Sequence, residues 1–542
     1  MTGADFVCVA EAIVDGDNFF VTAKIINVET ARIERSDNEL MQTNAQSIKE
    51  GCEKLANKLL GVSETKTISA HSSNNLLEKG IASMVSANYG DAYYSFSELY
   101  DKGDKDACFY LAQLFYRGDG VQQSNEKAKQ YAEEGISNGK NINGYILGAL
   151  NEGEVAENYY KKAFDEMKSS AESGNAISQC NLGYMYASGK GVSQDYYEAL
   201  KWYRKSAEQG YARAQCILGN LYFNGEGVLL DKTEAVNWYR KAAEQGNAEA
   251  QCYLGYMYYS GEGVSQDKTE AVNWYRKAAE QWNAEAQYNL GVMYEFGEGV
   301  SQDKTEAVNW YRKAAEQGDA RAQCNLGYMY ESGEGVSQDK TEAVNWYRKA
   351  AEQGDARAQC NLGVMYYTGE GVSQDKTEAA NWYRKAAEQG YSEAQCNLAI
   401  MYRNGEGVTQ DKTEAANWYR KAAEQGDTIA QCDLGVMYDI GSGVSQDKTE
   451  AVNWYRKAAD QGNARAQCNL GYMYDIGSGV SQDKTEAIKW YRKAAEQGYS
   501  EAQYRMGVMY SKGSGVTKSK SKARKWWQKA CDNGLKEACE KL

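Results

Sequence analysis

Cysteine is the residue whose number and spacing first suggest chemistry in this chain of 542 residues. Eight of the 13 cysteines recur at steps of 36 residues or twice that, namely Cys180, Cys216, Cys252, Cys324, Cys360, Cys396, Cys432 and Cys468. Thiols in such numbers could form disulfides, hold zinc or act as reactive nucleophiles. Which of these applies depends on how far apart the secondary-structure elements hold the sulfur atoms.

Histidine, the most frequent general base and a frequent metal ligand, is almost absent. His71 is the only one, and it lies in the polar stretch TISAHSSNN. One histidine leaves little room for nucleophile–His dyads or mixed Cys/His zinc sites, and the sequence contains no P-loop or HExxH motif. We therefore expect no catalytic residue, no metal and no cofactor, and predict that the protein is not an enzyme.

The charge balance argues against two further classes of function. The chain has 61 Lys and Arg against 75 Asp and Glu, a formal net charge of −14. Binders of nucleic acid and of anionic membranes need basic surfaces, so neither is expected as a partner. No run of about 18 apolar residues exists, and hence no transmembrane segment is predicted. The complete absence of proline suits a chain of many helices.

The cysteines belong to a repeat with a period of 36 residues. Tryptophan recurs ten times at this step, from Trp202 to Trp526, and columns of Tyr, Gly and Val keep the same spacing. We assign ten repeats to 175–534, diverged repeats to 75–174, and a capping helix to 535–542.

The segment 319–354 shows what one repeat folds into. Its second half has an apolar face at helical spacing, formed by Ala343, Trp346, Tyr347, Ala350 and Ala351. Asp339 is placed to cap the start of this helix, and Gly354 to end it in the left-handed conformation. The first half predicts a shorter helix with Ala322, Leu326, Met329 and Tyr330 on one face, where Gly327 allows the partner helix to approach closely.

A helix pair of this kind cannot bury its apolar face alone, so neighbouring pairs must stack. This predicts an all-α fold, a right-handed α-solenoid of about 13 helix-hairpin repeats, preceded by a small α+β segment. Equivalent helices then lie about 8–10 Å apart, whereas a disulfide needs Cα atoms within about 7 Å. We expect the aligned cysteines to be small packing residues without disulfides or zinc; a row of reactive thiols along a groove is the alternative.

The repeated pattern A-x-x-x-L-G-x-x-Y-x-x-G-x-G-V-x-x-D-x-x-x-A-x-x-W-Y-x-K-A-A-x-x-G resembles the Sel1-like repeat over about 104–534. That repeat is a relative of the tetratricopeptide repeat with a longer loop between its helices. The resemblance implies a scaffold or adaptor that binds other proteins. Trp282 stands where nine other repeats have the terminal glycine, and we expect that helix end to be capped differently.

A helical projection of the first helix indicates where a partner would bind. With Leu326 facing the core, Arg321, Cys324, Tyr328 and Glu331 point away, and in tetratricopeptide-type stacks this face lines the concave groove. The corresponding columns vary among the repeats, which either tunes recognition or reflects an unconstrained surface. The predicted groove residues are Arg321, Tyr328, Glu331, Arg357, Val364, Tyr367, Glu393, Ile400, Arg403, Val436, Asp439, Tyr472 and Asp475.

The first sixty residues have a different pattern. Residues 5–13 and 18–28 predict two strands joined by a turn at Asp15 and Gly16, 31–35 a third strand, and 44–60 an amphipathic helix. This segment, 1–60, resembles the C-terminal part of an α/β domain of the curli-secretion-lipoprotein type. A polar linker is expected over 61–74.

The function predicted from these features is a non-enzymatic scaffold that binds a protein or peptide in the concave groove. The alternatives are a structural spacer of the cell envelope and an enzyme acting on small molecules or peptidoglycan. The residues after Met1 do not form a signal peptide, which favours the cytoplasm. A start codon further upstream would instead allow a periplasmic or envelope protein.

Overall fold

The computed structural model describes residues 6–15, 18–27 and 72–542, which belong to two compact units, Met1–Asn75 and Leu76–Leu542. In the first unit, β1 (Phe6–Asp15) and β2 (Asn18–Asn27) pair antiparallel, with Phe6 opposite Asn27 and Asp15 opposite Asn18. The two strands lie where the sequence predicts them. The predicted third strand and the helix over 44–60 lie outside the described residues.

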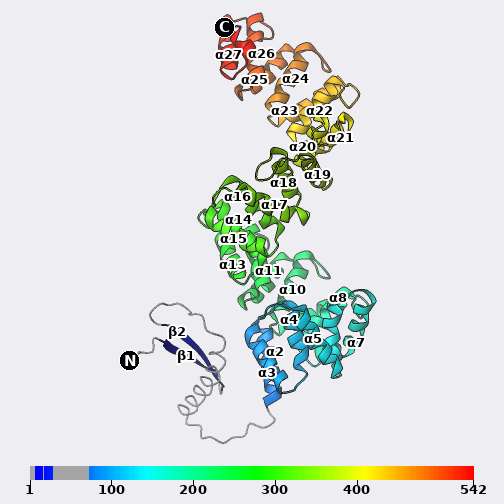
Figure 1. Cartoon of the computed structure of the whole chain (residues 1–542). Helices are drawn as coiled ribbons and strands as arrows, with labels where there is room; N and C mark the ends of the chain where they lie inside the picture. The colour runs from blue at the N-terminus through cyan, green and yellow to red at the C-terminus, as the bar shows by residue number, and fades with distance from the viewer. Residues whose placement is uncertain (1–5, 16–17, 28–71) are drawn as a thin grey trace. The chain divides into compact units, whose positions relative to one another are not determined.

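The second unit is built from helices, and the period of 36 residues divides them into pairs (Figure 1). The first helix of each pair, helix A, is α8 (Ala176–Ser188), α10 (Ala212–Asn224), α12 (Ala248–Ser260), α14 (Ala284–Phe296), α16 (Ala320–Ser332), α18 (Ala356–Thr368), α20 (Ser392–Asn404), α22 (Thr428–Ile440), α24 (Ala464–Ile476) and α26 (Ser500–Lys512). The second, helix B, is α9 (Tyr196–Glu208), α11 (Lys232–Glu244), α13 (Lys268–Glu280), α15 (Lys304–Glu316), α17 (Lys340–Glu352), α19 (Lys376–Glu388), α21 (Lys412–Glu424), α23 (Lys448–Asp460), α25 (Lys484–Glu496) and α27 (Lys520–Asp532).

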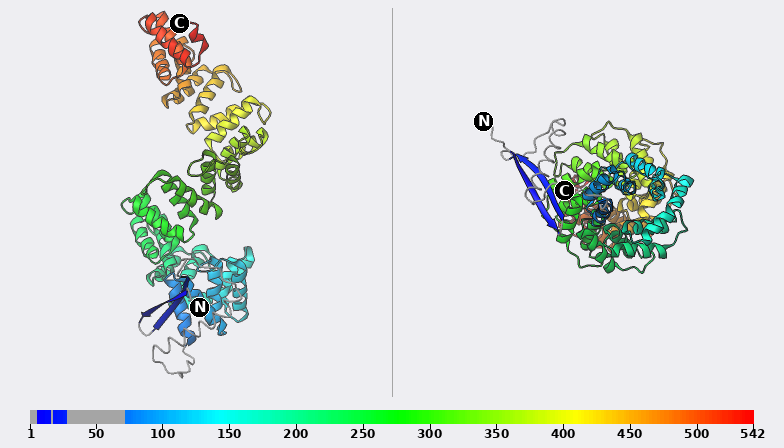
Figure 2. Two further views of the ribbon diagram at one scale, coloured as in Figure 1. Left: turned by 60° about the vertical axis from the view of Figure 1, so that its left-hand side comes forward. Right: turned by 90° about the horizontal axis from the view of Figure 1, so that it is seen from below.

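Shorter or less regular helices precede and follow these ten pairs. They are α2 (Ser72–Val85), α3 (Tyr89–Asp101), α4 (Ala107–Arg117), α5 (Asn125–Ser137), the 3-10 turn η1 (Asn141–Asn143), α6 (Gly144–Ala149), α7 (Gly153–Glu172) and, at the end, α28 (Lys536–Cys539). Helix α2 begins inside the segment expected to be a linker. Each pair lies against the next in chain order, and Figure 2 shows the stack turning as it proceeds. The predicted all-α solenoid is confirmed.

The ends of the helices follow the capping residues in the sequence. The Asp339 carboxylate accepts the backbone N–H groups of Thr341 and Glu342, both at 3.0 Å, at the start of α17. Gly333 ends α16 with φ +77°, a left-handed conformation that glycine adopts without strain. Because the same residues recur in nearly every pair, the turns repeat and the pairs stack regularly.

Aromatic side chains hold each pair together and join it to the previous one. Tyr347 of α17 lies over Gly327 of its own pair, where an added Cβ would come within 2.7 Å of the ring. Trp346, one residue earlier, packs against α15 and α16, where it contacts a cluster that includes Leu326 and Met329. The Lys349 ammonium lies 3.8 Å from the centroid of the Trp346 ring, which adds a cation–π contact. The tryptophan column is therefore the seam between one pair and the next.

A buried glutamine reinforces this seam in every one of the ten pairs. Gln323 of α16 donates its amide to the Ala315 carbonyl at the end of the preceding helix B, at 3.0 Å. Its oxygen accepts the amide of Gln353, at the end of its own helix B, at 2.7 Å. The buried amide is thereby satisfied on both sides, as a polar group in a core must be. This pair of hydrogen bonds was not predicted from the sequence, because glutamine is usually a surface residue.

Trp282 corrects one prediction about the turns. It has φ +66° and donates its backbone N–H to the Ala279 carbonyl at 3.1 Å, as Gly318 does to Ala315 at 3.0 Å. The helix end is thus capped in the same way as in the other repeats, and the expectation of a different cap is wrong. The side chain is 69 % exposed, so the bulky residue accepts a left-handed backbone without packing that compensates for it.

Replacing Trp282 by Gly should stabilise the solenoid by about 0.5–1 kcal/mol. The substitution removes about 1–2 kcal/mol of left-handed strain and adds about 0.5–1 kcal/mol of unfolded-state entropy. Urea denaturation followed by circular dichroism measures the change. The matched control is Gly318→Trp, which should lose a similar amount; equal midpoints for wild type and both variants would contradict the strain.

Trp346→Ala should destabilise the chain by about 3–5 kcal/mol, because it opens a cavity between two pairs. In a stack where each pair depends on its neighbours, the loss should appear as a local unfolding of the middle repeats. Hydrogen exchange of the backbone amides resolves this, with faster exchange expected in 304–352. Unchanged exchange in that range would rule out the seam.

Candidate binding groove

The variable positions of helix A face neighbouring helices A across a set of cavities. We call these positions the groove face; they are the columns of Arg321, Asn325, Tyr328 and Glu331. One of these cavities has a volume of about 310 Å³ and is lined by residues of α10, α11, α12 and α14, including Phe223, Tyr253, Tyr256 and Glu285. A second, of about 240 Å³, shares Tyr256 and adds Tyr259, Tyr288 and Val292. Residues at the predicted columns therefore do lie together around these cavities. The cavities belong to α10–α14, in repeats that precede those of the predicted groove residues.

Tyrosines of one groove-face column are solvent-exposed. Where the column of Tyr328 contains tyrosine, the exposed fractions are 37 % for Tyr184, 41 % for Tyr256, 47 % for Tyr328 and 39 % for Tyr472. The tyrosines that follow each helix B tryptophan, such as Tyr347, are buried. The same residue type thus has two roles, and only the first leaves an aromatic face available to a partner.

The predicted groove residues divide into two groups. Five are exposed, namely Arg321, Tyr328, Arg357, Glu393 and Tyr472. Eight are half-buried, namely Glu331, Val364, Tyr367, Ile400, Arg403, Val436, Asp439 and Asp475. Their role in binding stays a prediction.

Several half-buried residues are held by partners within the chain. Glu331 accepts the Tyr347 hydroxyl at 2.6 Å, and Asp439 and Asp475 pair with Lys448 at 2.6 Å and Lys484 at 2.5 Å. Such groups would have to exchange an existing partner for a ligand. They are weaker candidates for direct contact than the exposed tyrosines.

Tyr367 is part of a connection between repeats. Its hydroxyl donates to Glu406 at 2.6 Å, and Lys376 donates to the same carboxylate at 2.8 Å. The Lys376 ammonium, followed by the Tyr367 hydroxyl, lowers the pKa of Glu406 to about 2. The carboxylate is therefore ionised at neutral pH, and this contact would be lost only as the pH falls towards 2.

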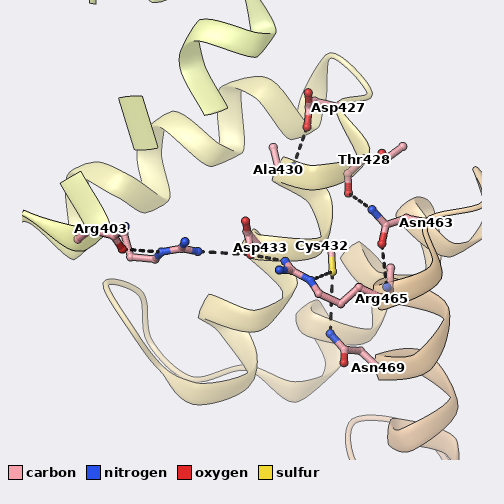
Figure 3. A network of polar contacts seen from close by, with 11 residues as sticks. Arg403, Asp427, Thr428, Ala430, Cys432, Asp433, Asn463, Arg465 and Asn469 are labelled. Atoms are coloured by element: carbon pink, nitrogen blue, oxygen red, sulfur yellow. Dashed lines mark hydrogen bonds and ion pairs between the residues drawn. The ribbon is translucent and has the colours of Figure 1, made fainter. Parts of the chain in front are cut away.

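Asp433 shows a column of the groove face that the sequence analysis missed. Figure 3 shows Asp433 between Arg403 of α20 and Arg465 of α24, so that three successive pairs meet at one carboxylate. Only 5 % of Asp433 is exposed, and a buried charge needs such partners. Most repeats have asparagine in this column, including Asn325 and Asn361. The sequence feature that could have predicted this contact is a single acid in a column that is mostly asparagine, with Arg403 in the preceding pair and Arg465 in the following pair.

The aligned cysteines are buried and unbridged, as predicted, and more deeply buried than expected. Each has a free thiol. Burial raises the pKa of Cys324, Cys396 and Cys468 to about 12, and only the thiolate is a strong nucleophile. Both observations favour packing over reactivity. The sequence analysis did not foresee the disulfide between Cys531 and Cys539, which joins α27 to α28 outside the repeat column.

The native protein at pH 8 should therefore leave these thiols unmodified by a water-soluble aromatic disulfide reagent. With a pKa of about 12, roughly one thiol in 10⁴ is ionised at that pH, and none is accessible. Mass spectrometry of the eight column cysteines measures the modification. Unfolding in guanidinium provides the positive control; rapid modification of the native protein would restore the reactive-thiol hypothesis.

The groove face is closed over the first repeats by the chain's own side chains. Arg117, at the end of α4, donates to the Tyr211 hydroxyl at 3.2 Å and to the Asn181 side-chain oxygen at 3.1 Å. Asn175 donates to the Tyr110 hydroxyl of α4 at 3.0 Å. Helix α4 therefore lies across α8 and the start of α10, and the open part of the groove begins beyond it.

Neither a membrane-spanning helix nor a metal-binding cluster is found in the part of the chain that the structure describes. No helix there combines the length and hydropathy needed to cross a bilayer. No three His, Cys, Asp or Glu side chains converge there as metal ligands would.

Comparison with known proteins identifies the repeat. A sequence model of the Sel1 repeat matches residues 105–140, 176–211, 212–247, 248–281, 284–319, 320–355, 356–391, 392–427, 428–463, 464–499 and 500–535. One match ends directly before Trp282. The matches omit 141–175, where α6 is short.

Two solved structures are similar to the chain. A protective antigen of uropathogenic Escherichia coli with an SLR fold is 35 % identical, with a TM-score of 0.62, over 83 % of this chain and 89 % of the antigen. A Sel1 repeat protein from Oxalobacter formigenes is 39 % identical, with a TM-score of 0.47, over 57 % of this chain and 90 % of its own. No match was found among curated proteins. With eleven repeats that span most of its length, the chain belongs to the Sel1 repeat family.

Proposed function

We propose that the protein is a non-enzymatic scaffold that binds a peptide or an extended segment of a protein along the groove face. The Sel1 and tetratricopeptide-like fold is typical of protein-interaction scaffolds. The observation that carries the proposal is the row of exposed tyrosines, Tyr184, Tyr256, Tyr328 and Tyr472, on that face.

The physical reason is that tyrosine gives a large contact area with little loss of conformational entropy and keeps a hydroxyl for hydrogen bonding. Binding energy at interfaces is concentrated in such aromatic anchors and in arginine. The cavities around Tyr256 provide recesses between neighbouring tyrosines that a partner's side chains would fill.

The asparagines in the column of Asn325 favour a peptide as the ligand. The side chains of Asn289 and Asn361 make no hydrogen bond with any residue that the structure describes, and both carry a donor and an acceptor. A peptide backbone presents the complementary pair at regular intervals. Amides along the groove would bind the main chain, and the tyrosines would select side chains.

Replacing Tyr256, Tyr328 and Tyr472 together by Ser should reduce partner binding by at least about 100-fold, since each anchor contributes about 1–2 kcal/mol or more. Partners captured from a lysate by the wild-type chain are identified by mass spectrometry, and their affinity for each variant is then measured by calorimetry. The helical content should remain unchanged, because these side chains do not pack in the core.

The matched control is Tyr197→Ser. Tyr197 is also exposed but lies on helix B, at the start of α9, away from the groove face. This variant should bind like the wild type. Equal binding by the triple variant, or an equal loss in the control, would contradict the proposal.

A further inference from the structure

One groove-face arginine differs from the others in its column. Arg321 pairs with Asp319 at 2.7 Å, Arg357 donates to Asn325 at 2.5 Å, and Arg465 pairs with Asp433. Arg213, the fourth arginine of the column, makes no hydrogen bond or ion pair with any described residue. The partners of Arg357 and Arg465 lie 32 residues earlier in the chain. The equivalent residue for Arg213 is Asn181, whose side-chain oxygen accepts from Arg117 instead.

A second guanidinium lies near it. Arg117 reaches across from α4, and its hydrogen-bond partners are the uncharged side-chain oxygens of Tyr211, Asn181 and Gln113. Asp119, the nearest acid on its own segment, acts on it through space without forming an ion pair. A half-buried guanidinium with only neutral partners is costly unless an anion approaches it.

Both arginines line the same cavity, which contains no acidic residue. Its volume is about 150 Å³, and its lining includes Tyr145, Tyr184 and Ile217 from α6, α8 and α10. The Tyr184 hydroxyl accepts the Lys190 ammonium at 2.8 Å, which brings a third cation to the rim. The lining of this pocket is therefore positively charged, in a chain with a formal net charge of −14.

The pocket lies where the open groove ends. On α10, Ile217 borders the pocket, and Asn220, about one helical turn later, borders the 310 Å³ cavity that contains Tyr256. On its other side α4 crosses the groove face through Arg117. A peptide that lies along the groove would therefore have to stop at this point.

We propose that Arg117 and Arg213 bind the free C-terminal carboxylate of the peptide partner. This rests on the proposed function and adds a direction to it, with the end of the peptide at α8 and α10 and the preceding residues over α12 and α14. The unpartnered planar fork of Arg213 suits the two oxygens of a carboxylate, and the Arg117 guanidinium adds positive charge to the same pocket. Tyr145 and Ile217 would cover the last side chain.

The test uses the full chain immobilised on beads and two pools of random octapeptides. The pools have acetylated N-termini and differ only in a C-terminal carboxylate or amide. The wild type should retain the carboxylate pool about tenfold better, a difference of about 1.4 kcal/mol. In Arg213→Gln this ratio should fall to about one. Arg357→Gln, which changes the same column where the arginine already has a partner, should keep it.

The remaining outcomes of this experiment distinguish a failure of the carboxylate site from a failure of the proposed groove function. Equal retention of both pools by the wild type, reduced by the triple tyrosine substitution, would overturn the carboxylate site and leave the groove function intact. Retention of neither pool would count against both. Enrichment of Asp or Glu within the amide pool would overturn the assignment to a chain end, and so would a ratio unaffected by Arg213→Gln.

Discussion

The burial of one pair's tryptophan against the preceding pair is the interaction on which the rest of the structure depends. Trp346 packs onto α15 and α16, and Gln323 fixes the same two elements through hydrogen bonds on both sides. A helix pair has no sufficient core of its own, so its stability comes from its neighbours. Since these residues recur almost unchanged, the seam constrains helix B and the core side of helix A and leaves the groove face free to vary.

The residues that pack the stack are thus different from the residues that are available for recognition. The same chain places buried tyrosines such as Tyr347 in the seam and exposed ones such as Tyr328 on the groove face. Variation on the groove face does not disturb packing, which allows each repeat to carry a different side chain at a fixed position. Some of that variation serves the stack itself, as Asp433 shows by joining three pairs.

The period of 36 residues predicts those structural features that involve only one helix pair and its immediate neighbour. The helices, the Asp339 cap and the close contact at Gly327 follow from the sequence pattern alone. A helical projection also gave the direction of the groove face. It does not predict the partners of half-buried residues. Tyr367 and Arg403 are predicted groove residues, and both are held by neighbouring acids.

Contacts between distant repeats could not be read from the sequence. Helix α6 has six residues where the regular helices A have 13, and α4 reaches across it to α8 and α10. No periodic pattern encodes that crossing, which closes the groove and leaves Arg213 without a partner. The buried glutamine column was visible in the sequence, but residue type alone argued for the surface.

Hydrogen–deuterium exchange of the full chain, with and without a captured partner, tests the central claim most directly. The account predicts slower exchange on binding in helices A such as 248–260 and 320–332, with little change in helices B such as 304–316. Protection confined to helices B, with the groove face unchanged, would contradict it.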